Sequence, residues 1–289
     1  MLSRRDTLLG AQAQSDPPLS YTPSPDQVRF AALEASLGGR IGVAAWNTGT
    51  GAWLGYRSNE AFAMCSTFKW ALVAAQLNMA QNGGPQLGEI VRFAEADLLD
   101  YAPVAREHLA RGWMTIEECC AAAVGLSDNT AANLLLQIQG GPEGFTRFLR
   151  AHGDTVTRLD RTEPSLNENE PGDLRDTTTP DAMARTLQRF LLEDGVLSPA
   201  HREQLIGWMV ASPTGRERLR AGLPPSWRVA DKTGTGGGAN NATNDVAIAW
   251  PPHGAPIVIT AYLSRNSADA AARNAAHAEI GRIVAAAWS

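Results

Sequence analysis

Cysteine and histidine are scarce in this chain, and neither is spaced for a structural site. The 289 residues include three cysteines, two of them adjacent, and five scattered histidines. An odd cysteine count with one adjacent pair makes a poor disulfide framework. Because no Cys-x-x-Cys or His-x-x-x-His spacing occurs, the sequence predicts neither a structural nor a catalytic zinc ion. We therefore expect three free thiols, no metal and no other cofactor.

Basic clusters and long apolar runs are also missing. The net charge of −5 without a basic cluster argues against nucleic acid as a partner. No apolar stretch reaches the length of about 20 residues that spans a bilayer. The length suits one large domain or two closely packed ones. A chain of this size can bury a hydrophobic core large enough to be stable without disulfides or metals. We expect a soluble, globular monomer that contacts neither nucleic acid nor membrane.

The first 23 residues predict an export signal or a disordered tail. Ser3-Arg4-Arg5-Asp6-Thr7-Leu8-Leu9 resembles a twin-arginine signal. The apolar region that follows is only Leu8 to Ala11, shorter than the usual stretch of about 7–15 residues. Two arginines in a random polar tail are the alternative. We interpret residues 1–23 as a shortened signal and expect a periplasmic or secreted protein.

Strand patterns lie near both ends of the chain and helix patterns lie in its middle. The predicted strands cover 41–47, 52–56, 227–235, 244–250 and 257–263, and the predicted helices cover 25–37, 66–80, 115–124, 130–139, 142–151, 180–192, 199–210 and 268–288. Sequential strands joined by tight turns imply antiparallel pairing. The sequence therefore predicts an α/β (α+β) fold with a five-stranded antiparallel sheet flanked by the terminal helices.

The order of these elements also predicts two lobes. Residues 24–60 and 211–289 would form the sheet domain, and residues 61–210 would form an inserted all-helical domain. Ligand sites are frequent where two domains meet. We therefore expect the active site in the cleft between the lobes.

The segment 63–69 precedes a helix pattern that is apolar on nearly all sides. Ser66 and Lys69 would lie on one face of the first turn of this helix. A hydroxyl needs a base to become a nucleophile, and burial pushes a lysine toward its neutral form. By itself, the pair also suits a helix-capping serine and an exposed lysine. The chemical interpretation therefore depends on motifs elsewhere in the chain.

Three further polar motifs occur where a plain core would be apolar. They are Ser127-Asp128-Asn129, Glu163-Pro164-Ser165-Leu166-Asn167 and Lys232-Thr233-Gly234-Thr235. Taken singly, they suit a helix cap, a surface loop, and a strand whose lysine is in solvent and whose glycine forms a bulge. All of them together with Ser-x-x-Lys, in this order, are very improbable by chance.

The four motifs together resemble the class A serine β-lactamases. The resemblance runs from about Pro25 to the C-terminus and includes the stretches 127–135 and 175–180. It implies the two-lobed fold of serine β-lactamases and DD-peptidases. It also implies hydrolysis of penicillins and cephalosporins, with β-lactam antibiotics as the binding partners and antibiotic resistance as the outcome.

The resemblance implies a catalytic role for five residues. Ser66 would attack the lactam carbonyl, and Lys69 would accept or relay its proton. Ser127 would pass a proton to the departing nitrogen. Glu163, with Asn167, would hold the water that hydrolyses the acyl-enzyme, on a segment corresponding to the family's omega loop. Whether Lys69 or Glu163 is the base for acylation stays open.

The resemblance also implies the substrate contacts. Asn129 would bind the side-chain amide, Tyr101 would lie at the cleft mouth, and the backbone N–H groups of Ser66 and Thr235 would form an oxyanion hole. The residues implied around the substrate carboxylate are Arg218, Lys232, Thr233, Gly234 and Thr235.

Other implied features concern pairs of residues. Arg161 and Asp176 would form a salt bridge that closes the loop carrying Glu163, and the Glu163–Pro164 bond would be cis. Two disulfides found in parts of this family would each lack a partner. Val73 stands opposite Cys120, and Gly236 stands opposite Cys65. The substrate spectrum, including carbapenems, stays open.

Three other functions compete with this hypothesis. A penicillin-binding DD-peptidase shares Ser-x-x-Lys and Lys-Thr-Gly but does not need Glu163 and Asn167. A penicillin-sensing domain, which is a binding module, is acylated once and should also lack the water-activating carboxylate. A serine glutaminase is more distant. Turnover of a chromogenic cephalosporin separates these possibilities.

Overall fold

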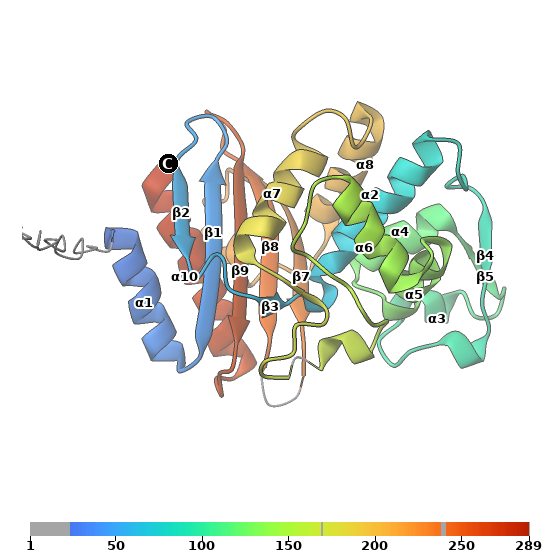
Figure 1. Cartoon of the computed structure of the whole chain (residues 1–289), viewed down its shortest axis with the longest axis horizontal. Helices are drawn as coiled ribbons and strands as arrows, with labels where there is room; N and C mark the ends of the chain where they lie inside the picture. The colour runs from blue at the N-terminus through green and yellow to red at the C-terminus, as the bar shows by residue number, and fades with distance from the viewer. Residues whose placement is uncertain (1–23, 169, 238–240, 289) are drawn as a thin grey trace, which may run out of the picture.

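The structure is a computed structural model that describes residues 24–168, 170–237 and 241–288. The predicted export segment, residues 1–23, lies outside the described residues. The predicted α/β fold is confirmed, because a five-stranded antiparallel sheet has the order β2-β1-β9-β8-β7. Its strands are β1 (Arg40–Asn47), β2 (Trp53–Tyr56), β7 (Arg228–Thr235), β8 (Thr243–Trp250) and β9 (Ile257–Ser264). Strand β7 is one edge of the sheet and lies next to the helical part of the molecule (Figure 1).

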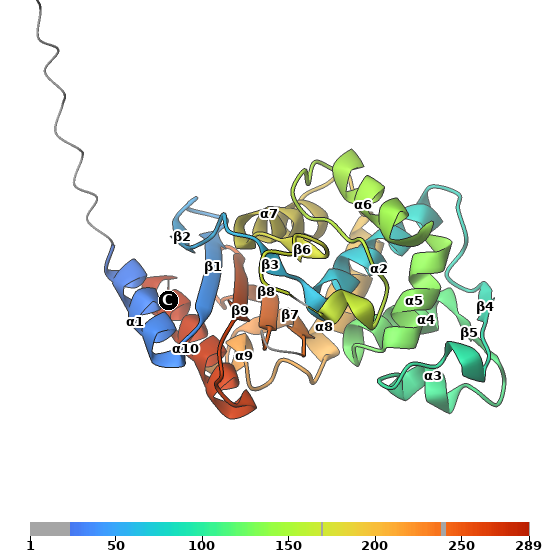
Figure 2. The same cartoon turned by 60° about the horizontal axis from the view of Figure 1, so that its bottom comes forward.

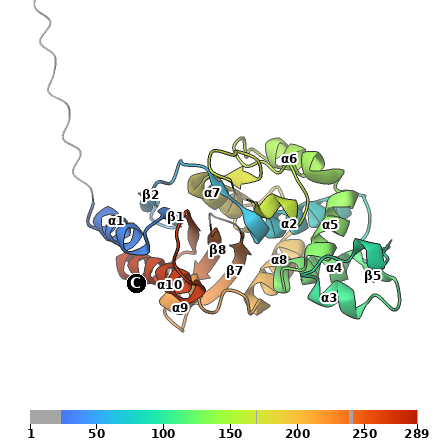
Figure 3. The same cartoon turned by 90° about the horizontal axis from the view of Figure 1, so that it is seen from below.

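Helices cover both faces of the sheet. The terminal helices α1 (Pro25–Leu37) and α10 (Ala270–Trp288) contact each other and lie on one face. Helix α7 (Pro180–Leu191) packs against β1, β8 and β9 on the opposite face (Figure 3). All eight residues of β9 are therefore buried, as expected for a strand covered on both sides.

Helix α2 (Phe68–Gln81) is the centre of the helical part. It contacts the four helices around it, which are α4 (Ile116–Gly125), α5 (Asn129–Ile138), α6 (Gly141–Ala151) and α8 (Pro199–Ala211) (Figure 2). Because neighbours lie on every side, eleven of its residues are buried. The prediction of a helix that is buried all round is confirmed.

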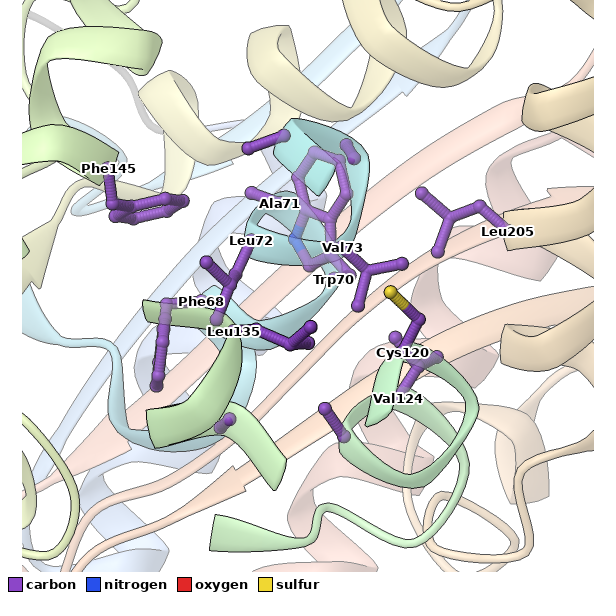
Figure 4. Packing of buried hydrophobic residues seen from close by; sticks show 14 of the residues in the cluster. Phe68, Trp70, Ala71, Leu72, Val73, Cys120, Val124, Leu135, Phe145 and Leu205 are labelled. Atoms are coloured by element: carbon purple, nitrogen blue, oxygen red, sulfur yellow. The ribbon is translucent and has the colours of Figure 1, made fainter. Parts of the chain in front are cut away.

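The core around α2 accommodates a buried tryptophan and two adjacent cysteines. Trp70 is fully buried, and its ring meets Phe190 edge-on with the centroids 5.9 Å apart (Figure 4). This tryptophan therefore fills the core between α2 and α7. The sulfur of Cys120 points toward Val73 (Figure 4), and Cys65, Cys119 and Cys120 are all free. The expectation of three free thiols is confirmed.

The sequence patterns missed the short elements. These are β3 (Phe62–Ala63) paired with β6 (Thr177–Thr178), β4 (Ile90–Arg92) paired with β5 (Trp113–Thr115), helices α3 (Pro103–Glu107) and α9 (Leu219–Gly222), and the 3₁₀ turns Cys65–Thr67, Glu95–Asp97 and Ser165–Asn167. Segments of two to five residues span at most about one and a half periods of a hydrophobic pattern, too few for a repeat to show.

Two expectations about helices change in detail. Ser66 lies in the 3₁₀ turn Cys65–Thr67, and α2 itself begins at Phe68 rather than at residue 66. A 3₁₀ turn at a helix N-terminus is common and shifts the boundary by one or two residues. Helix α7, expected within the helical domain, contacts the sheet as well. The division into residues 24–60 with 211–289 and residues 61–210 stays a prediction.

Candidate active site

Ser66 is held against the edge of the sheet by backbone contacts. The Asn244 side chain on β8 donates to the carbonyls of Ala63 and Met64, at 2.9 and 3.0 Å. A Cβ at Gly234 would lie 2.7 Å from the Met64 oxygen, so only glycine lets β7 pass this close. The preceding residue, Cys65, has a φ of 46°, a conformation that costs about 1–3 kcal/mol for a non-glycine residue. Surrounding contacts therefore hold the turn in a strained position.

Lys69 lies one helical turn beyond Ser66 and is fully buried. Its Nζ donates to Asn129 Oδ1 at 2.5 Å and to the Ser127 carbonyl at 2.8 Å. It also lies 2.9 Å from Glu163 Oε1, which accepts from the Ser66 hydroxyl at 3.2 Å. Burial lowers the pKa of Lys69, and the Glu163 carboxylate opposes this shift. One carboxylate oxygen therefore faces both the serine hydroxyl and the lysine.

Glu163 is positioned by a loop that is fastened at several points. Asn133 on α5 donates to the Glu163 carbonyl at 2.9 Å and accepts from its N–H at 3.0 Å. Asn167 Nδ2 donates to Glu163 Oε2 at 2.5 Å. The Glu163–Pro164 bond is cis, as predicted. Asn133 was not singled out from the sequence, although it belongs to the stretch 127–135.

The predicted ion pair at the base of this loop is present. Arg161 Nε lies 2.6 Å from Asp176 Oδ2, and the Asp176 side chain is completely inaccessible to solvent. The other oxygen of Asp176 accepts from the backbone N–H groups of Asp160 and Arg161, at 2.7 and 2.9 Å. The two ends of the loop are thus joined through one buried carboxylate.

The Ser-Asp-Asn motif combines a structural role and a site role. Asp128 Oδ1 accepts from Ala131 N at 2.9 Å and caps α5, so the capping interpretation holds for this residue. Ser127 has a φ of 60°, and its hydroxyl accepts from Lys232 Nζ at 3.0 Å. This contact joins the helical part to the edge strand β7.

Lys232 is buried rather than in solvent, so the alternative of an exposed strand lysine is wrong. Its Nζ also donates to the Thr233 carbonyl at 2.8 Å. Burial holds the pKa of Lys232 well below its usual value, and the cations Lys69 and Arg218 contribute in the same direction. The edge strand thus carries a buried ammonium group pointing at Ser127.

Arg218 braces the end of β7 from the other side. It donates to the carbonyls of Gly234 and Asn244, at 3.0 and 2.7 Å, and to Thr235 Oγ1 at 2.8 Å. Burial lowers the pKa of Arg218, and the nearby Asp245 carboxylate opposes this effect. A guanidinium has no acceptor atom, so Thr235 receives this hydrogen bond and keeps its own proton free.

These groups surround one cleft of about 370 Å³. Its lining consists of Ser66, Tyr101, Ser127, Asn129, Asn167, Thr214, Arg218, Thr233 and Thr235. Lys69, Glu163, Lys232 and Gly234 are buried behind that lining. All twelve residues singled out from the sequence therefore meet at one site. Thr214 was missed because it belongs to none of the four motifs and the family resemblance assigned it no role.

Behind Arg218, a buried histidine predicts acid sensitivity. His277 on α10 is fully buried, with Nε2 3.0 Å from the Thr243 carbonyl. Burial, followed by the Arg218 charge, lowers its pKa to about 3. An unfolded histidine binds a proton near pH 6.5, so below that pH the unfolded state binds the extra proton. The stability that the protein gains by keeping His277 buried and neutral is therefore complete above about pH 6.5 and is lost as the pH falls toward 3.

The free energy of unfolding should therefore decrease by up to about 1.4 kcal/mol per pH unit through this residue below pH 6. Urea titrations of the parent and of His277→Gln at pH 7, 6 and 5 measure the difference. The variant should show the shallower dependence on pH. Equal slopes for the two proteins would contradict the prediction.

Metal-binding clusters and membrane-spanning helices are both absent from the described part of the chain. Within residues 24–168, 170–237 and 241–288, no group of three or more His, Cys, Asp or Glu side chains could hold a metal ion. In the same ranges, no helix is long and apolar enough to cross a membrane.

Comparison with known proteins agrees with this geometry. A family model described as the β-lactamase enzyme family matches residues 27–288. β-Lactamase L2 of Stenotrophomonas maltophilia is 48% identical over 255 residues, covering 88% of this chain and 83% of that protein. β-Lactamase CTX-M-25 of Escherichia coli is 45% identical over 267 residues, covering 92% and 90%.

Solved structures give the same result. An ancestral (GNCA) class A β-lactamase superposes with a TM-score of 0.88 at 54% identity, covering 91% of this chain and all of that chain. A β-lactamase from Xanthomonas campestris pv. campestris has a TM-score of 0.87 at 45% identity, covering 90% and 96%. The chain therefore belongs to the class A β-lactamases, a family of serine hydrolases.

Proposed function

We propose that this protein hydrolyses the β-lactam ring of penicillins and cephalosporins through an acyl-enzyme on Ser66, and so confers antibiotic resistance. One observation carries the proposal. Glu163 Oε1 is within hydrogen-bond distance of the Ser66 hydroxyl and forms an ion pair with buried Lys69. A nucleophile, an acceptor for its proton and a cation that stabilises this acceptor are thus next to each other.

In the first step, the Ser66 oxygen attacks the lactam carbonyl and its proton passes to Glu163. The three Lys69 donors all face acceptors, namely Asn129 Oδ1, the Ser127 carbonyl and Glu163. An ammonium group has three protons and no free lone pair. In this arrangement Glu163 is therefore the better acceptor, and Lys69 balances its charge.

The tetrahedral oxyanion would be stabilised by the backbone N–H groups of Ser66 and Thr235. Ser127 would then protonate the departing nitrogen as the ring opens. Its hydroxyl accepts from Lys232 Nζ, which leaves its own proton free to point into the cleft. The proton that Glu163 took in the first step would be relayed to Ser127 through Lys69, whose Nζ contacts both Glu163 and the Ser127 backbone. Glu163 would then be ionised again before the second step.

Deacylation needs a water held beside the ester. Asn167 Nδ2 is already bonded to Glu163, while its buried Oδ1 has no partner in the described part of the chain. Buried polar atoms without a protein partner are typically satisfied by ordered water. Glu163, ionised again, would take the proton of such a water, which then attacks the acyl carbon. The Ser66 oxygen would leave as the ester breaks and receive that proton back, which restores the free enzyme.

The substrate carboxylate would lie near the end of β7. Arg218 and Lys232 supply positive charge there, and Thr235 supplies a hydroxyl proton. Asn129 would bind the side-chain amide, with Tyr101 at the mouth. We also propose that the protein acts as an exported monomer in the periplasm or medium, where it would meet these antibiotics.

Steady-state assay of a chromogenic cephalosporin tests the proposed function. We expect many turnovers per enzyme, and none with Ser66→Ala. A single burst equal to the enzyme concentration would instead support the penicillin-sensing or DD-peptidase function. A Ser66→Ala variant as active as the parent would exclude the serine nucleophile.

A further inference from the structure

A line of three hydroxyl groups leads away from the cleft at Thr233. Thr233 Oγ1 is 2.9 Å from Thr214 Oγ1, which is 3.0 Å from Ser212 Oγ. Ser212 Oγ is in turn 2.9 Å from the carbonyl of Gly125, at the end of α4. Ser212 is 1% exposed and does not line the cleft, whereas Thr214 and Thr233 do.

The carbonyl at the far end determines which way every proton in this line points. A carbonyl oxygen can only accept, so the Ser212 hydroxyl donates to Gly125. The Ser212 oxygen can then only accept from Thr214, so the Thr214 proton points at Ser212. Thr233 therefore donates to Thr214, because each hydroxyl has a single proton. The Thr233 proton is directed away from the cleft.

Two other hydroxyls of the cleft have the opposite polarity. The Thr235 oxygen accepts from Arg218, and the Ser127 oxygen accepts from Lys232. Both receive a hydrogen bond from a cation, so both keep their protons available for a ligand. Thr233 donates its only hydroxyl proton to Thr214, so it can offer a ligand in the cleft only lone pairs. An anionic group in the cleft would therefore gain nothing from Thr233 until the hydrogen bond to Thr214 is broken.

We propose that Ser212 and Thr214 are positioning residues that hold the Thr233 proton out of the carboxylate subsite and thereby weaken binding of anionic substrates. The inference rests on the proposed function, since it needs the substrate carboxylate to lie beside Thr233. Removing the Ser212 hydroxyl leaves the Thr214 proton without an acceptor. Thr214 then donates to Thr233, whose own proton turns toward the ligand.

The test compares two substrates that differ only in charge, a chromogenic cephalosporin and its methyl ester. For Ser212→Ala, KM for the carboxylate form should fall about threefold to tenfold, since a hydrogen bond to a charged group is worth more than a neutral one. Its kcat, and KM for the ester, should change by less than about twofold. Ser212→Thr keeps the hydroxyl and should behave like the parent.

Thr214→Val gives a second, independent route. It keeps the side-chain size but removes the acceptor of the Thr233 proton, so KM for the carboxylate form should again fall. If Ser212→Ala unfolds below the assay temperature, Thr214→Val alone tests whether the Thr233 proton is held out of the carboxylate subsite. The inference would be overturned if KM for the carboxylate form were unchanged or raised, or if KM changed equally for both substrates. The proposed function would still stand in that case, provided that the parent turns over. A parent without turnover would overturn both.

Discussion

Replacing Glu163 by alanine should turn the enzyme into a protein that is acylated once and stays acylated. Hydrolysis needs two steps, and each needs a proton acceptor. The strained ring and the oxyanion donors assist the first step, whereas the ester on Ser66 must be attacked by a neutral water. General-base catalysis is worth about 10²–10⁴-fold, and deacylation should slow by that factor. Acylation should slow as well, because the Ser66 hydroxyl donates to Glu163. It should still occur, because burial lowers the pKa of Lys69 and Glu163 opposes this shift, so removing Glu163 lets burial push the lysine toward its neutral form, which can accept the proton.

Intact-mass measurement after mixing Glu163→Ala with a penicillin detects the acyl-enzyme directly. One substrate mass should appear on Ser66 and persist for minutes or longer, while the parent shows no lasting adduct. Glu170→Ala, an exposed carboxylate on the same loop, is the matched control and should turn over like the parent. Glu163 is not the deacylating base if Glu163→Ala keeps turnover within about tenfold of the parent, because that loss lies below the expected range.

Replacing Arg161 by serine should produce the largest loss of stability. The Asp176 carboxylate would then stay completely buried with only two backbone N–H donors. Removing one partner of a buried ion pair costs about 3–5 kcal/mol, because an uncompensated charge remains. The loop that positions Glu163 should loosen too, so kcat should fall and substrate preference should change.

Urea unfolding measures the loss of stability of Arg161→Ser, and steady-state kinetics measures its kcat and substrate preference. Arg158→Ser is the matched control, because its ion pair with Asp160 is half-exposed and should contribute at most about 1 kcal/mol. The double variant Arg161→Ser/Asp176→Asn should recover part of the loss, since no buried charge is left unpaired. A cost below about 1 kcal/mol for Arg161→Ser would show that the pair is not what closes the loop.

The sequence by itself predicted most of the architecture. Helix α1 illustrates why, since Ser24 and Gln27, only three positions apart, form a capping box at its start. Caps, turns and hydrophobic periodicity are all local signals. The five long strands and the main helices follow from them, whereas β3, β6 and α9 are too short to show a period.

The candidate site was predicted from the sequence as a set of residues, with roles that the family resemblance implied and that stay proposals. The four motifs contain ten of the twelve site residues. The family resemblance added Tyr101 and Arg218, and it also named the Arg161–Asp176 pair. Nothing in the motifs pointed to Ser212 or Thr214, because both lie outside them, just past the C-terminal end of α8.

Only the tertiary structure decided how these residues act on one another. Ser66 meets Glu163 across 97 positions of sequence, and Lys232 meets Ser127 across 105. Burial of Lys69 and Lys232, and hence the lowering of their pKa values, depends on segments that pack together only in the folded chain. The direction of the Thr233 proton likewise depends on the Gly125 carbonyl, which lies on another helix. Local patterns report the preferences of a segment, whereas solvation, charge and hydrogen-bond polarity are properties of its surroundings.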